Sequence, residues 1–305
     1  MRPLRRLAVA RDTAHPAQGR LSPAFRNSIL KNETRPEPPV TPNDDETPDD
    51  PKFVSALSRG LSLLRAFRPS EVWLSNHAFA QRTGLPKATV TRLTYTLCKL
   101  GYLQQAEPGG EYRLGPGVLA LGYGVLAGMD LKDRAALELA DICAGDNPNV
   151  AAALGERYGQ SVVYLATHRS PNSVSMVFHL GAQVPLFHSA IGRAILMGLP
   201  QDTQDSLLDE ALRDAPTDRH DRLRGGLARA RADFARWGFC TSFGEWRSEI
   251  NGIAVPVPPV QGRPLAAINV GGFAFLNPEA LLLDTYAPRL LRAAKTLSLR
   301  PQDHV

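Results

Sequence analysis

Two short helical segments joined by a four-residue turn constrain the fold of this chain more than any other feature of its sequence. Ser75 is suited to cap a helix over about 76–82, and Thr83-Gly84-Leu85-Pro86 reads as a tight turn after it. A further helix is expected from about Lys87 to Leu100, with Gly101 as its stop signal. Two helices joined by a short turn that contains glycine are typical of a helix-turn-helix.

The flanking segments complete a winged helix-turn-helix. An earlier helix is indicated before Pro69, because apolar residues recur there at spacings of three and four. Two short strands, about 102–106 and 111–114, are joined by the turn Glu107-Pro108-Gly109-Gly110. The apolar residues of the first helix are Val54, Leu57, Leu61, Leu64 and Phe67, and those expected to face inward on the third are Val90, Leu93, Leu97 and Leu100.

Positive charge is concentrated in this same segment. Residues 51–116 hold nine Lys and Arg against three Asp and Glu, whereas residues 1–50 hold eight of each and the whole chain carries +5. Clustered cations favour nucleic acid, because they release the counterions condensed on phosphates. A solvated basic surface explains the charge equally well when charge is considered alone.

The rest of the chain divides into three parts. Residues 1–50 are rich in proline and acidic residues, which predicts a disordered leader. The apolar, glycine-containing segment 117–130 suits a linker helix that pairs with its copy in a dimer, or a core helix. Residues 131–300 alternate helical and strand patterns, which predicts an α+β domain with an antiparallel sheet. Its expected helices are 131–144, 189–198, 201–214, 219–237 and 278–298, and its expected strands are 149–155, 161–168, 174–179, 239–245, 250–258 and 265–270.

Several classes of protein fit the sequence poorly. Cys98, Cys143 and Cys240 are too widely spaced for a CxxC zinc site or a disulfide framework, and the histidines show no HxxxH pair. No G-x-S-x-G motif supports a serine hydrolase. No apolar run is long enough to span a membrane, and the basic start lacks the features of a signal peptide. We therefore expect a cytoplasmic protein without metal, cofactor or enzymatic activity.

Three stretches resemble the isocitrate-lyase-regulator (IclR) family. Residues 84–93, Gly-Leu-Pro-Lys-Ala-Thr-Val-Thr-Arg-Leu, are similar to the family pattern G-L-P-K-S-T-V-x-R-L, with Ala88 in place of a serine. Residues 181–196 look like its G-x-x-x-P-L-H-x-T-A-x-G-K-A-x-L, and Ile253-Ala-Val-Pro-Val257 like its I-A-A-P-V. The resemblance covers about residues 53–298. It implies a winged helix-turn-helix, a linker helix and an effector domain with a GAF- or profilin-like sheet, assembled as a dimer or a dimer of dimers.

The third helix is expected to lie in the major groove of double-stranded operator DNA. Arg92 is the favoured base reader, Lys87 contacts a base or a phosphate, and Arg113 reaches the minor groove or the backbone from the hairpin. Ser75 offers a helix start to a phosphate, although capping is its plain role. The DNA-contacting set is Lys87, Ala88, Thr89, Thr91, Arg92, Tyr95, Ser75 and Arg113.

The resemblance also implies a small-molecule effector, of the carboxylate or aromatic kind, bound between the sheet and the loop that starts a helix near Ser189. A helix start attracts anions through its free N–H groups. The effector-binding set is His188, Ser189, Ala190, Ile191, Gly192, Ser242, Glu245, Gly252 and Asn269. Many family members carry acids and a cysteine where this chain has Ser242 and Gly252, and a serine where it has Asn269, so the effector's identity does not transfer.

Two other functions remain open at this point. One is a GAF-like protein with an enzymatic or protein-contact role and no specific DNA binding. The other is an RNA-binding or architectural protein, which the lack of aromatic residues arranged for base stacking disfavours. Specific DNA affinity with a steep salt dependence distinguishes the regulator from both.

Overall fold

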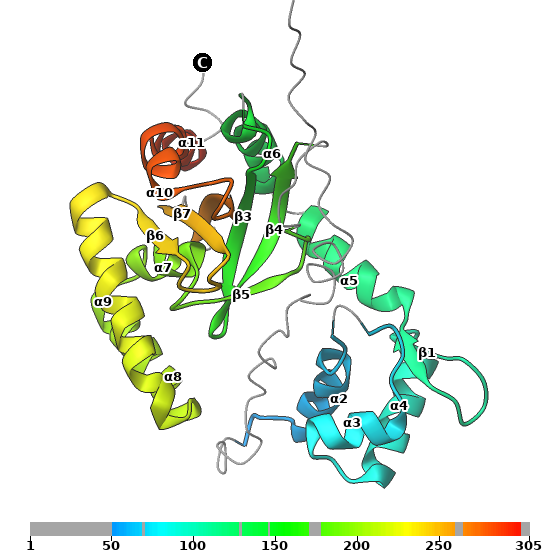
Figure 1. Cartoon of the computed structure of the whole chain (residues 1–305). Coiled ribbons are helices and arrows are strands. Elements are labelled where there is room, and N and C mark those ends of the chain that lie inside the picture. Colours follow the sequence, from blue (N-terminus) through cyan, green and yellow to red (C-terminus); the bar gives the residue numbers. More distant parts are fainter. Residues whose placement is uncertain are drawn as a thin grey trace, which may run out of the picture.

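The computed structural model describes residues 51–68, 71–127, 130–145, 147–170, 178–259 and 265–299. The predicted leader over residues 1–50 lies outside these ranges. The chain is of the α+β class, as predicted, with helices and a small hairpin first and a six-stranded antiparallel sheet afterwards (Figure 1).

The first part is a winged helix-turn-helix. Its elements are α2 (Ser55–Arg65), α3 (Asn76–Thr83), α4 (Lys87–Lys99), β1 (Leu103–Gln105) and β2 (Tyr112–Leu114). Leu74 adds a one-residue bridge to the hairpin by exchanging two backbone hydrogen bonds with Tyr112. Gly84 ends α3 at φ +70°, a left-handed conformation that glycine adopts at least cost. The turn, both helices and the wing are therefore as predicted, with strands shorter by one or two residues.

The small core of this part differs in detail from the predicted one. It is built on Leu63, Leu74, Phe79, Leu85, Val90, Leu103 and Tyr112. The apolar stripe of α2 largely misses it, since Leu57 is 62% exposed and Leu61 41%, whereas Leu63 is fully buried. The prediction that Leu100 faces inward is wrong, because it caps the end of α4 at 63% exposure. Periodicity identifies a helix face but does not say what that face meets.

Helix α5 (Pro116–Ala127) occupies most of the predicted linker segment. Gly115 and Gly117 pack against the backbone at Gly101, where an added Cβ would lie 2.3 and 2.9 Å from the carbonyl oxygen of that residue. Beyond this start, the apolar side chains of α5 face solvent, with Leu119 at 76% and Tyr123 at 69% exposure. Helix α6 (Asp130–Cys143) follows, and 128–129 lie outside the described residues.

The second part is one antiparallel sheet with helices on both faces. Its strands are β3 (Ala151–Tyr158), β4 (Ser161–Arg169), β5 (Gln183–Pro185), β6 (Cys240–Phe243), β7 (Ile250–Val257) and β8 (Ala266–Phe273), in the spatial order β5-β4-β3-β8-β7-β6. Its helices are α7 (Ala190–Met197), α8 (Gln201–Asp214), α9 (His220–Trp237), α10 (Glu279–Leu281) and α11 (Ala287–Ser298).

The two faces of this sheet enclose separate hydrophobic cores. Alternate residues of the strands pack with α6 and α11 on one side, including Leu139, Leu154 and Leu290. The other side packs with α7, α8 and α9, including Ile191 and Leu227 (Figure 1). Strands covered on both faces lose the polar–apolar alternation of an exposed sheet, and β7 is buried along its whole length.

Three predictions for this part need comment. The strand expected at 174–179 lies mostly outside the described residues, and β5 was not predicted because three residues give no periodicity. The helix predicted over 278–298 is present from Glu279 to Ser298, but a five-residue π-helical turn, Leu282–Tyr286, lies between α10 and α11. Pro288 follows this turn at the start of α11 and has no N–H to donate to a preceding carbonyl.

Candidate DNA interface and effector site

Helix α4 presents one polar face to solvent. Lys87, Ala88, Thr91, Arg92 and Tyr95 are all exposed. The opposite face buries Val90 and Thr94, the latter donating its hydroxyl to the Val90 carbonyl. Most of the predicted base-contacting residues therefore share one surface, with Thr89 half-buried at its edge.

The polar groups on this face differ in the hydrogen-bonding atoms that they leave free for a ligand. The hydroxyl of Thr91 donates to the Lys87 carbonyl at 3.0 Å, so its oxygen lone pairs and its methyl group remain for a ligand. The Lys99 ammonium lies 5.4 Å from the centre of the Tyr95 ring, a cation–π contact at the end of the same face. The face can thus offer cations, acceptors and apolar groups to the edges of base pairs.

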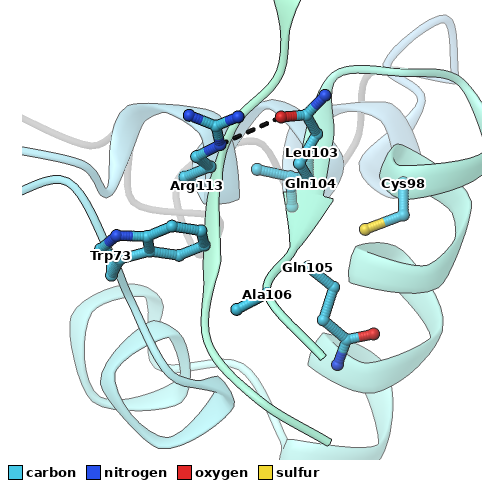
Figure 2. Close-up of a pocket in the computed structure, with 7 residues that line it drawn as sticks. All are labelled: Trp73, Cys98, Leu103, Gln104, Gln105, Ala106 and Arg113. Atoms are coloured by element: carbon cyan, nitrogen blue, oxygen red, sulfur yellow. Dashed lines mark hydrogen bonds between the residues drawn. The ribbon is translucent and has the colours of Figure 1, made fainter. Parts of the chain in front are cut away.

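The hairpin carries a second polar surface beside α4. Arg113 and Gln104 are cross-strand partners, and the Arg113 Nε donates to the Gln104 Oε1 at 3.0 Å. The guanidinium also lies 5.6 Å from the centre of the Trp73 ring. Figure 2 shows these side chains at the rim of an open groove of about 660 Å³. The groove is lined by Trp73, Cys98, Leu103, Gln104, Gln105, Ala106 and Arg113.

Ser75 serves as the N-cap of α3. Its Oγ accepts a hydrogen bond from the Ala78 N–H at 3.2 Å, which is the capping role expected of it. Nearby, Arg82 makes two hydrogen bonds to the carboxylate of Glu71, at 2.6 and 2.8 Å, and a third to the Ala66 carbonyl. These contacts lower the pKa of Glu71, and they tie α3 to the segment that follows α2.

In the second part, the start of α7 is held by its own cap and by close backbone packing. Ser189 Oγ accepts from the Gly192 N–H at 3.1 Å and donates to the Pro185 carbonyl at 2.6 Å. Gly192 lies against Leu186, where an added Cβ would be 2.2 Å from the carbonyl oxygen. Among the described hydrogen bonds, none uses the N–H of Ala190 or Ile191, so the first turn retains donors for a ligand.

A buried arginine that the sequence reasoning missed lies in the same helix. Arg193 is 1% exposed, and its guanidinium makes a bidentate pair with Glu245 at 2.9 and 2.6 Å. It also donates to the carbonyls of Phe187 and Thr241. The signal was in the quoted motif, since Arg193 occupies the position of the lysine in the family pattern.

The pair explains the state of Glu245. Burial alone raises the pKa of this carboxyl, but the hydrogen bonds from Arg193 and the nearby Arg229, at 3.4 Å, outweigh burial and lower it. Both carboxylate oxygens are occupied by Arg193, so Glu245 connects α7 to the loop after β6. This geometry gives it a structural partner in addition to the effector-binding role predicted for it.

His188 precedes this helix in a partly buried and cationic setting. Burial, together with Arg222 and Arg193, lowers the pKa of the imidazole to about 4. The ring is therefore neutral near pH 7, with one nitrogen as donor and the other as acceptor. Its backbone carbonyl accepts from the Ser242 Oγ at 2.7 Å, which joins β6 to the loop before α7.

The sheet brings the other predicted effector residues under the start of α7. The register places Ser242 opposite Gly252 and Ala254 opposite Asn269, on neighbouring strands. Ala254 packs in the core on the α7 side, so alternation along the strands directs this whole group toward α7. A Cβ on Gly252 would lie 3.8 Å from the Ala190 Cβ, which is ordinary contact distance.

Two absences concern only the residues that the structure describes. There, no group of three or more His, Cys, Asp or Glu side chains is placed to hold a metal ion. No described helix combines the length and apolar character needed to cross a bilayer.

Comparison with known proteins agrees with this geometry. The model of the IclR helix-turn-helix domain matches residues 56–107, and that of the bacterial transcriptional regulator IclR C-terminal domain matches residues 123–299. The HTH-type transcriptional regulator TsaQ1/TsaQ2 of Comamonas testosteroni is 30% identical over 78% of this chain and 85% of its own length. The predicted resemblance is thus confirmed.

Two solved structures are similar as well. That of an IclR family transcriptional regulator from Brucella abortus is 37% identical with a TM-score of 0.74, covering 82% of this chain and 93% of that one. That of an IclR homolog from Microbacterium hydrocarbonoxydans, complexed with 4-hydroxybenzoate, is 19% identical with a TM-score of 0.62, covering 80% and 97%. The second likeness concerns the fold alone.

A winged helix-turn-helix followed by a ligand-sensing α+β domain defines a one-component transcriptional regulator. The chain belongs to the IclR family, and it is a DNA-binding regulator with a C-terminal effector-binding domain.

Proposed function

We propose that this regulator binds an operator sequence through the exposed face of α4 and changes its DNA affinity when a small organic acid binds beneath α7. The DNA-binding part of this proposal rests on one observation. Lys87, Thr91 and Arg92 share a solvent-facing surface on the recognition helix. Because its target is chromosomal DNA, we place the protein in the cytoplasm. We assign it no catalytic role.

On the DNA side, Arg92 is the proposed base reader, since a guanidinium can bond guanine O6 and N7 together. Lys87 lies at the start of the helix and suits a base or a phosphate. Tyr95 is the proposed phosphate contact at the far end. Arg113 is the proposed backbone contact from the wing, because it is exposed and the Nε bond to Gln104 fixes its guanidinium beside the hairpin (Figure 2).

On the effector side, the acid's carboxylate is proposed to accept from the free N–H groups of Ala190 and Ile191. The neutral His188 ring supplies a further donor. Ser189 and Gly192 shape the turn, while Ser242 and Gly252 form the strand surface below it. Glu245 acts indirectly, because its ion pair with Arg193 positions the start of α7.

The unit that binds DNA is proposed to be a homodimer, or a dimer of such dimers. Helix α5 is apolar around its circumference, yet among the described residues Leu119, Leu121, Tyr123 and Val125 remain exposed. A helix that is apolar on all sides is normally buried. A second copy is the proposed occupant, since helix-turn-helix dimers read two half-sites about one helical turn apart.

The first test is a gel shift of the full chain against DNA flanking its own gene, at two salt concentrations with excess competitor DNA. Selective binding that weakens steeply with salt supports the proposal, because the logarithm of affinity falls by about 0.9 per phosphate contact per decade of salt. Binding without selectivity, or none, would overturn it and favour a protein-contact role for the domain.

A further inference from the structure

Among the described residues of the effector domain, three enclosed side-chain acceptor atoms have no hydrogen-bond partner, Glu156 Oε1, Gln160 Oε1 and Asn269 Oδ1, and of these residues only Asn269 is buried as a whole. Asn269 is 5% exposed, and its side-chain oxygen Oδ1 receives no hydrogen bond. Native proteins pair nearly all such atoms, because an unpaired one loses its water without compensation. An orphaned acceptor beside a ligand-binding element therefore points to a group that the ligand brings.

The position of Asn269 relative to α7 follows from the strand register. Ala267, two residues earlier on β8, packs in the α7-side core, so Asn269 faces the same way. Its cross-strand partners are Ala254 on β7 and Ala153 on β3, both small. Gly252 lies diagonally next to it, and a Cβ added to Gly252 would lie 3.8 Å from the Cβ of Ala190, the first residue of α7. Because a cross-strand diagonal spans about 7–8 Å, Asn269 and Gly252 are near neighbours on the face of the sheet that α7 covers.

Tyr164 is the polar neighbour of this amide. It is 2% exposed on β4, its side chain makes a hydrogen-bonding contact with Asn269, and burial raises the pKa of its phenol. The phenol is therefore neutral and can donate or accept. Exchanging the two ends of the amide changes which end meets Tyr164 and leaves the other end unpaired.

A hydroxyl group is the ligand function that fits both arrangements. It can donate to the free oxygen or accept from the free NH₂ group, whereas a carboxylate satisfies only the second. A carboxylate is also better placed at the α7 N-terminus, whose dipole favours negative charge. One end of the site therefore favours a carboxylate and the other a hydroxyl, both on the same ligand.

We propose that Asn269 selects hydroxylated organic acids, with the acid group at the start of α7 and the hydroxyl on the Asn269–Tyr164 pair. This inference rests on the effector site proposed above and specifies its substrate class. Asn269 determines specificity, since an acid without the hydroxyl leaves the amide buried and unpaired. Sites built to bond a hydroxyl discriminate strongly against analogues that lack it.

The test measures binding of matched acids to the full-length protein by isothermal titration calorimetry. The pairs are 4-hydroxybenzoate with benzoate, and 4-hydroxyphenylacetate with phenylacetate. We expect the hydroxylated member of at least one pair to bind at least about tenfold more tightly. In Asn269→Leu the preference should fall to about one, mainly by weaker binding of the hydroxylated acid. Asn269→Ser keeps a hydrogen-bonding group and should retain part of the preference, which covers the case in which the leucine variant fails to fold.

Operator binding is measured on the same samples, which separates the two proposals. If both members of each pair bind equally well, the hydroxyl preference is overturned and the acid site stands. If none of the four acids binds while operator binding is intact, both the hydroxyl preference and the acid site are overturned, and the DNA-binding function is not. A preference that survives in Asn269→Leu assigns selectivity to another residue and overturns the role of Asn269.

Discussion

The buried charge of Arg193 is paired with one carboxylate, that of Glu245, beside its hydrogen bonds to two backbone carbonyls. Removing one partner of a buried ion pair leaves an uncompensated charge, and the cost usually exceeds the net value of the pair. We expect Glu245→Ala to lower the free energy of unfolding by about 3 kcal/mol, at the lower end of the usual range because Glu245 is partly exposed. Urea denaturation measures the change. Glu249→Gln is the control, since Glu249 is exposed and should shift stability by less than about 0.5 kcal/mol. Equal effects in the two variants would contradict a structural role for the pair.

His188 makes stability depend on pH with a predictable sign. Its pKa of about 4 lies below the ordinary 6.5, so the folded state disfavours the charged ring. The stability it contributes is present above about pH 6.5 and is lost as pH falls toward 4. Over this range we expect the wild type to lose about 2 kcal/mol more than His188→Gln, after discounting for partial exposure. Thermal unfolding at several pH values checks this, and parallel curves for the two proteins would refute it.

A substitution at Arg92 shows whether this side chain contacts a base or a phosphate. If its guanidinium contacts a guanine, Arg92→Ala should cost about 1–3 kcal/mol at one base pair and relax selectivity there alone. Fluorescence anisotropy against operators substituted at each position measures this. Lys99→Ala is the matched comparison, because Lys99 is exposed beside Tyr95 at the far end of the same helix face and suits a phosphate. Loss of a phosphate contact weakens binding to all sequences alike and reduces the salt slope by about one. A uniform loss in Arg92→Ala would make it a phosphate contact instead.

At the level of elements, α9 offers two adjacent glycines with opposite surroundings. A Cβ on Gly226 would lie 2.4 Å from the Phe187 carbonyl oxygen, whereas one on Gly225 meets nothing within 4 Å. Gly226→Ala should therefore push α9 away from the loop before α7 and destabilise the domain by about 1–3 kcal/mol. Gly225→Ala should stabilise it by about 0.5–1 kcal/mol through helix propensity. The denaturation midpoints of the two variants measure these effects. Shifts in the same direction would contradict the close packing of Gly226 against Phe187.

These elements also show where sequence reasoning succeeds and stops. Two helices were predicted nearly to the residue, α3 behind its Ser75 cap and α8 over 201–214, because capping and periodicity are local. The exposure of Leu57 and Leu100 and the π-turn before Pro288 depend on what each element meets across the fold. The same holds for the site. Its loop and strands followed from motifs, but the burial of Arg193 and the unpaired oxygen of Asn269 arise only when α7 packs on the sheet.

For the whole molecule, the exposed surface of α5 is the contact proposed to join two chains. Leu119 and Tyr123 are four residues apart and therefore lie on one side of the helix. Glutamates at both positions place like charges at a self-complementary contact, where each faces its copy. If the proposed dimer forms through α5, the wild type should sediment as a dimer and Leu119→Glu/Tyr123→Glu as a monomer at the same concentration.

Operator affinity should fall with this loss of assembly, by roughly 10²-fold, because binding at the second half-site ceases to be intramolecular. Phe275→Glu is the control, since Phe275 is 63% exposed in the segment after β8, outside α5, and should change neither property. A double variant that stays dimeric would move the interface to another surface, of which the exposed stripe of α2 at Val54, Leu57 and Leu61 is the next to test. A monomeric variant with unchanged operator affinity would instead show that one chain suffices for recognition, and that α5 pairing serves only the effector domain.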